Sequence, residues 1–233
     1  MSNVRVALAS WSKKLVDDVD EFNKHLVLQW KNYNGITVTM MYCTGLITYF
    51  YGGNHTRLAR RTDMDEWFVS NLHHKNGYHL WTNTGIILIL GCWYELNHGA
   101  IFTALLIIFA SIITTLSTTV YAYGASGTGF AFQGALLADF VSRAHHDENL
   151  FRMLMNFKLS LALGIGNLIT LASNDAFSNV CVSCHVSGYV TGLAFMFAHG
   201  AVVMWKKKRV RRGLLNCSLG ILCTGGLVTM ATM

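Results

Sequence analysis

Residues 120–142 read VYAYGASGTGFAFQGALLADFVS, an apolar stretch long enough to cross a bilayer as one helix. Near its start stands the group Gly124-Ala125-Ser126-Gly127. One interpretation is helix packing, because small residues let neighbouring membrane helices approach closely and serine is ordinary in such contacts. The other is a nucleophile at a helix N-terminus, with glycines that leave room for the backbone of a substrate. The remainder of the chain decides between the two.

The whole chain has the composition of a membrane protein. Of its 233 residues, 52% are hydrophobic and only 13% are charged, whereas about 25% are charged in an average soluble domain. The charged residues gather between seven apolar stretches, most of them long enough for a membrane span. These predicted spans are 36–51, 78–96, 100–120, 122–142, 153–172, 184–205 and 213–233. The pattern predicts an all-α fold, a polytopic bundle of membrane helices.

A basic run sets the predicted orientation of the bundle. Residues 206–212 read KKKRVRR and follow the sixth span directly, which marks that side as cytoplasmic. The net charge of +6 is therefore attributed to membrane topology, and we expect no nucleic-acid partner. Counting back along the spans places the N-terminus in the cytoplasm and the connection 53–77 on the exoplasmic side. That connection holds Asn54-His55-Thr56, a glycosylation sequon that matters only in a lumenal loop.

The predicted organisation has four parts. Residues 1–35 form a cytoplasmic amphipathic segment, 36–205 a six-span core, 206–212 a basic linker and 213–233 a seventh span. The first segment repeats large apolar residues at three- and four-residue spacing, as an amphipathic helix does. These residues are Trp11, Leu15, Val19, Phe22, Leu26 and Trp30. Such a helix fits either the headgroup region of the lipid bilayer or the cytoplasmic face of the bundle itself.

Four polar side chains share one predicted depth. His79 and Asn83 lie one turn apart on span two, Ser126 begins span four and His185 begins span six. Spans two, four and six run in the same direction, because an odd number of crossings separates each from the next. A serine, a histidine base and two hydrogen-bond donors at one depth are the components of acyl transfer. Asp139 is excluded as a third member, because thirteen residues of helix place it about 20 Å from Ser126.

Three motifs resemble those of the rhomboid intramembrane serine proteases. They are Gly124-Ala-Ser126-Gly127 on the fourth span, His185 with Gly188 and Gly192 on the sixth, and His79-x-x-x-Asn83 on the second. Gly91-x-x-x-Glu95-x-x-x-Gly99 is also similar to the close of their second span. The resemblance covers about residues 67–205. The chain departs from the family in reading Asp65-Glu66-Trp67 where a Trp-Arg pair is usual, and it contains no proline.

The resemblance implies a serine endopeptidase that cleaves transmembrane segments of other membrane proteins near the exoplasmic side. It implies that Ser126 is the nucleophile and His185 its general base. The Ser126 backbone N–H, Asn83 and His79 would form the oxyanion hole, and Phe130 would pack under the catalytic histidine. A seventh span after the core is similar to eukaryotic secretory-pathway members, so we expect a secretory or plasma membrane. Neither a metal ion nor a cofactor is expected.

Two alternatives remain open at the level of sequence. One is a catalytically inactive rhomboid-like protein that binds membrane segments without cutting them. The other is a membrane c-type haem protein, because Cys181-Val-Ser-Cys184-His185 spells the C-x-x-C-H attachment motif. Haem attachment would leave His79, Asn83 and Ser126 without a role. Gly188 and Gly192, one and two turns beyond His185, instead predict tight contact between spans four and six.

Overall fold

The structure is a computed structural model, and it describes residues 10–21, 23–24, 36–52, 69–117, 124–143, 154–159, 161, 182–206, 216, 218–220 and 222. The main elements are the helices α2 (Thr37–Tyr51), α4 (Gly77–His98), α5 (Ala100–Leu116), α6 (Ser126–Arg143) and α8 (Val182–Lys206). Within the described ranges the only regular secondary structure is helical, which confirms the all-α class. None of the helices there combines the length and the mean hydropathy that a bilayer crossing requires. The predicted seventh span lies almost wholly outside the described residues, so the count of seven stays a prediction.

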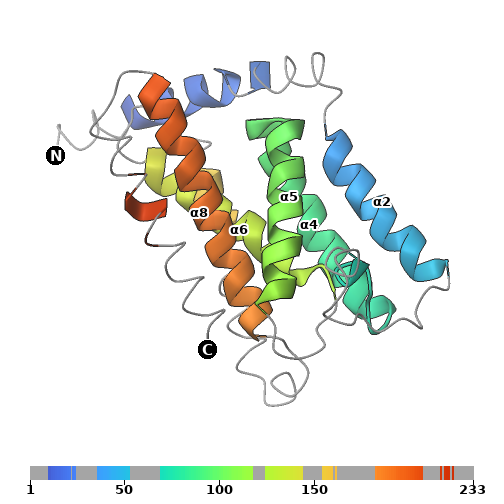
Figure 1. The fold of residues 1–233 in the computed structure, drawn as a ribbon. Helices are drawn as coiled ribbons and strands as arrows, with labels where there is room; N and C mark the ends of the chain where they lie inside the picture. Colours follow the sequence, from blue (N-terminus) through green and yellow to red (C-terminus); the bar gives the residue numbers. More distant parts are fainter. Residues whose placement is uncertain are drawn as a thin grey trace.

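The helices alternate in direction as the sequence predicts. Helices α4, α6 and α8 begin at the lower end of the bundle in Figure 1, and α2 and α5 begin at the upper end. Asn76 caps α4, because its side-chain oxygen accepts the backbone N–H of His79 at 2.9 Å. Gly99, with φ +85°, ends α4 and precedes α5 directly. The first residues of α4, α6 and α8, which carry the polar side chains singled out in the sequence, therefore share one end of the molecule.

Helix α6 lies at the centre and packs most extensively against α8. The contact depends on glycine, because a methyl group on Gly188 would overlap the carbonyl of Gly127 and one on Gly192 would overlap that of Ala131. A methyl group on Gly134 of α6 would in turn overlap the carbonyl of Tyr189. The predicted close approach of the fourth and sixth apolar stretches is therefore present, and the two backbones touch over two turns.

The carboxylates of Glu95 and Asp139 are buried near the opposite end of the bundle. Glu95 accepts the backbone N–H groups of Val38 and Thr39 at 2.9 and 2.8 Å, and so satisfies donors at the start of α2. Asp139 accepts the Asn156 amide at 2.7 Å and lies 3.6 Å from Nε2 of His98. Both acids therefore have structural partners at the end of the bundle opposite Ser126, and Asp139 lies there as the sequence analysis predicts.

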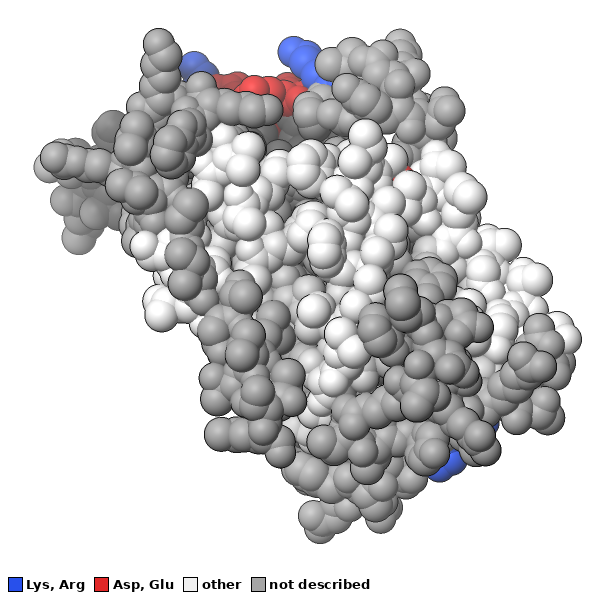
Figure 2. All heavy atoms as spheres, in the orientation of Figure 1, with Lys and Arg blue, Asp and Glu red and all other residues white. Residues whose placement is uncertain are grey.

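Charged side chains are distributed toward the ends of the molecule. On the face drawn in Figure 2, the described surface over the middle of the bundle is almost entirely uncharged, and the Lys, Arg, Asp and Glu atoms gather at its upper and lower margins. Residues 10–21 form a helix across the upper end of the bundle in Figure 1. Trp11 on this helix is 58% exposed. The second half of the predicted amphipathic pattern lies outside the described residues, namely Phe22, Leu26 and Trp30.

Candidate active site

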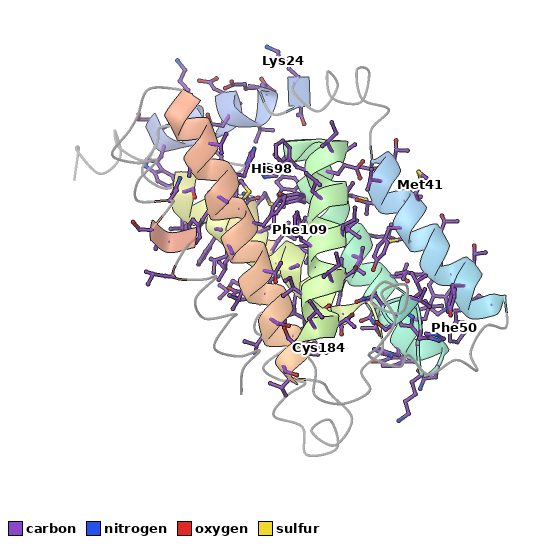
Figure 3. The ribbon with its side chains drawn as sticks, viewed as in Figure 1. Lys24, Met41, Phe50, His98, Phe109 and Cys184 are labelled. Carbon is purple, nitrogen blue, oxygen red and sulfur yellow. The ribbon has the colours of Figure 1, made fainter. Side chains whose placement is uncertain are left out.

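The site is centred on a contact between the first residue of α6 and the first turn of α8. Nε2 of His185 lies 2.9 Å from Oγ of Ser126, a hydrogen-bond distance. Both side chains are half-buried, so the pair is shielded by the bundle but still open on one side. Figure 3 labels Cys184, the neighbour of His185, at the lower end of α8, far from His98 at the upper end of α4.

An aromatic ring fixes the plane of the histidine. Phe130 lies one turn after Ser126 on α6, and its ring stacks on that of His185 with centroids 4.3 Å apart and planes 18° from parallel. The stacking limits rotation of the imidazole and leaves its edge toward Ser126. Among the described residues no carboxylate bonds to His185, so the contacts that orient its ring are those with Phe130 and Ser126.

A glycine with unusual backbone geometry faces two polar side chains of α4. Gly124 has φ +111°, a conformation that disfavours side chains. A methyl group placed on it would lie 2.7 Å from Cε1 of His79 and 3.4 Å from Nδ2 of Asn83. The structure therefore brings His79 and Asn83 against the turn that leads into Ser126. The absence of a side chain at Gly124 keeps the space in front of them open.

The helix start adds backbone donors to this space. Ser126 is the first residue of α6, and the first N–H groups of a helix have no acceptor within the helix. The same end carries the positive part of the helix dipole. Together these groups form an environment suited to a developing negative charge close to the Ser126 hydroxyl.

The segment before α4 holds this turn in place. The Ser70 carbonyl accepts the Gly124 N–H at 3.1 Å. The Asn71 amide donates to the Ser111 carbonyl of α5 at 3.3 Å. On the other side, His73 Nε2 lies 2.9 Å from the Tyr49 hydroxyl of α2. The segment 69–76 is thus tied to α2, to α5 and to the turn before Ser126.

The side chain of His74 points into the site from this segment. Its Nδ1 lies 3.0 Å from the Leu72 carbonyl, and its Nε2 lies 3.1 Å from Nδ2 of Asn83. Burial lowers the pKa of His74 to about 4, an effect that its bond to Leu72 opposes and that the neighbouring His79 and His73 increase. At neutral pH the His74 ring is therefore uncharged.

The structure brings together six of the residues that sequence reasoning selected. They are Gly124, Ser126, Phe130, His185, His79 and Asn83. The remaining two, Gly127 and Gly188, lie in the contact between α6 and α8, and a methyl group on Gly127 would also lie 2.6 Å from Cγ2 of Thr114 on α5. Their absent side chains thus make room for neighbouring helices, whereas Gly124 leaves space beside the serine.

Sequence reasoning missed Ser70 and Asn71 in the segment before α4, and the polar side chains of span three that lie near the site. Asn71 and Ser70 both approach Thr115, and Thr114 packs against Gly127. One signal was available, since Ser111 and Thr115 stand one turn apart on a mostly apolar helix and so form a polar strip. That spacing predicts a polar neighbour, but it does not say which segment supplies it.

The surroundings of His185 do not fit haem attachment. A haem iron would need a nitrogen lone pair of this ring, but Nε2 faces Ser126 and the ring face is covered by Phe130. Cys184 is buried, and its partner in the motif, Cys181, lies outside the described residues. Within those described ranges no group of three His, Cys, Asp or Glu residues is placed to hold a metal ion.

Comparison with known proteins identifies the family. The family model described as the Rhomboid domain matches residues 61–201, more than half of the chain and all of the site described above. No curated protein sequence matches the chain closely enough to count as a relative. On the strength of the domain match, the chain belongs to the rhomboid family, whose members are integral membrane proteins and in general intramembrane serine proteases.

Proposed function

We propose that the protein is an intramembrane serine endopeptidase with Ser126 as nucleophile and His185 as general base. The observation that carries the proposal is the 2.9 Å contact between Ser126 Oγ and His185 Nε2, at the start of two helices. A serine that only aids helix packing has no need of a histidine stacked in place beside it. Family membership supports the same chemistry.

The reaction follows from the geometry. His185, neutral and with its proton on Nδ1, accepts the Ser126 proton at Nε2 while Oγ attacks the carbonyl carbon of the scissile amide. The tetrahedral intermediate collapses when His185 returns that proton to the leaving amine, which forms an acyl-enzyme and releases one product. Water then attacks the ester with His185 again as base, and Ser126 is regenerated. The half-burial of both residues is consistent with entry of that water.

The oxyanion would be held by three donors. They are the Ser126 backbone N–H at the start of α6, and the Asn83 amide and His79 ring that lie beside Gly124. Removing one such donor lowers kcat by about 10²–10³ in other serine proteases. The dipole of α6 strengthens the hole, because its positive end lies at Ser126.

The proposed substrates are transmembrane segments of other membrane proteins. An amide within a helix is shielded by its own hydrogen bonds, so the substrate must unwind locally before its backbone reaches Ser126. Our proposal keeps the predicted topology, with the N-terminus cytoplasmic, the site near the exoplasmic surface, and a seventh span following the six-span core 36–205. The proposed location is a secretory-pathway or plasma membrane.

Labelling by a fluorophosphonate probe in detergent tests the dyad. We expect the wild type to be labelled, Ser126→Ala to be unlabelled, and His185→Ala to be labelled about 10²-fold or more slowly, as loss of a general base predicts. Ser187→Ala is the matched control. Ser187 is a buried serine two residues from His185, and its hydroxyl donates to the Cys184 carbonyl and is not part of the dyad.

Two results would contradict the proposal. One is a folded wild-type protein that stays unlabelled and leaves transmembrane substrates intact. The other is equal labelling of wild type and Ser126→Ala. Either would favour the alternative of an inactive member that binds membrane segments without cutting them.

A further inference from the structure

The orientation of the Asn83 side chain depends on one histidine outside the dyad. His74 Nε2 lies 3.1 Å from Asn83 Nδ2, and both side chains are buried. The backbone N–H of Ala125 also points at the same ring nitrogen, at a longer 3.5 Å. One atom of His74 therefore meets both sides of the proposed oxyanion hole, the amide from α4 and the turn before Ser126.

The protonation state of His74 follows from its other nitrogen. Nδ1 lies 3.0 Å from the Leu72 carbonyl, which can only accept, so Nδ1 carries the ring proton. In a neutral imidazole the second nitrogen is then an acceptor, and Nε2 accepts from the Asn83 amide. That bond uses one of the two N–H groups on Asn83 Nδ2. The other N–H remains for the substrate oxyanion, next to the space left by Gly124.

We propose that His74 is a positioning residue that fixes the Asn83 amide with its donor side toward the oxyanion. The inference rests on the proposed function, because it assigns a part of that same site. Without the Nε2 acceptor the amide is free to turn its carbonyl oxygen toward the developing negative charge. A small displacement of a catalytic donor lowers the rate far more than it weakens binding.

A purely structural role for His74 makes a different prediction. His74 also anchors the segment 69–76 through the Leu72 carbonyl, and loss of that anchor alone would loosen the segment. Two substitutions separate the nitrogens, because an Asn amide lies near the position of Nδ1 and a Gln amide lies near that of Nε2. His74→Asn keeps a donor for Leu72 and removes the acceptor for Asn83. His74→Gln does the reverse.

Cleavage of a fluorogenic transmembrane substrate by the full chain in detergent measures the difference. We expect His74→Asn to lower kcat by about 10- to 100-fold with KM nearly unchanged, since the lost contact acts on the transition state. We expect His74→Gln to retain kcat within about threefold of wild type, although it lacks the anchor, because the Asn83 acceptor sets the rate. In an Asn83→Ala background, His74→Asn should lower kcat much less than it does alone, because the residue through which it acts is gone.

His73→Gln is the matched control. His73 is the adjacent buried histidine, and it contacts Tyr49 of α2. The His73→Gln variant should lower the thermal stability of the protein as much as the His74 variants do, with little change in kcat. The inference is overturned if His74→Gln is as slow as His74→Asn. It is also overturned if His74→Asn lowers kcat by the same factor in the Asn83→Ala background as it does in the wild type. Failure of the proposed function is a separate result, seen as wild-type protein no more active than Ser126→Ala.

Discussion

Gly124 is the residue on which the open space of the site depends. Its φ of +111° is compatible with glycine and disfavours any other residue, and a side chain there would stand against His79 and Asn83. The absence of a side chain at Gly124 thus leaves the proposed oxyanion site accessible.

We predict that Gly124→Ala lowers kcat by about 10²-fold or more, because the methyl group displaces His79 and occupies the space for the substrate oxygen. Cleavage kinetics of the purified variant measure the effect. Gly85→Ala is the control, as Gly85 lies on α4 two residues after Asn83 and a methyl group there meets no atom within 4 Å. Equal activity of Gly124→Ala and wild type would show that the oxyanion does not bind beside Gly124.

At the scale of whole elements, the contact between α6 and α8 sets the distance from Ser126 to His185. The two residues lie on different helices, so the dyad persists only while the helices hold their separation. Gly188 lies about one turn after His185 and meets the carbonyl of Gly127, the neighbour of Ser126. Helix packing and catalytic geometry are therefore determined by the same few residues.

We predict that Gly188→Ala both destabilises the fold and slows the enzyme. The methyl group would overlap backbone, which cannot rotate away, so α8 must shift and take His185 with it; overpacking of this kind costs about 1–3 kcal/mol. Thermal unfolding in detergent and the rate of fluorophosphonate labelling report the two effects. Gly45→Ala on α2, where a methyl group meets no atom within 4 Å, should change neither. If Gly188→Ala is labelled at the wild-type rate, the contact between α6 and α8 at Gly188 does not set the distance between Ser126 and His185.

For the molecule as a whole, the buried His74 links folding to pH. Its pKa is about 4 in the folded protein and 6.5 in the unfolded chain, so between these values the unfolded chain binds a proton that the native state does not. The free energy of unfolding is therefore unaffected by this group above pH 6.5, and it falls as the pH drops from 6.5 toward 4.

We predict that the melting temperature of wild type falls more steeply between pH 7 and pH 5 than that of His74→Gln, which has no titrating group at this position. Other histidines contribute to both proteins, so the difference in slope isolates His74. Thermal unfolding across this pH range provides the measurement. Parallel curves would mean that His74 is protonated as readily in the folded state as in the unfolded chain.

Sequence reasoning identified the helical class and the residues of the site because both follow from the positions of apolar and polar residues along the chain. Residues on one helix are located by a rise of 1.5 Å each, and successive apolar stretches reverse direction. From these two rules His79, Asn83, Ser126 and His185 come to one end of the bundle, and Asp139 goes to the other. The structure agrees, with His185 at Ser126 and Asp139 beside His98.

The rise per residue and the alternating direction of the spans determine the depth of a residue along the bundle, but they do not determine which helices are neighbours. The amino-acid sequence by itself determined the all-α class, the common depth of the polar residues and the glycines that let two helices touch. Only the tertiary structure decided the lateral contacts, such as the 2.9 Å dyad and the bond from Asn83 to His74. The physical reason is that a lateral distance depends on side-chain packing across several elements at once, and no spacing within one stretch of sequence encodes it.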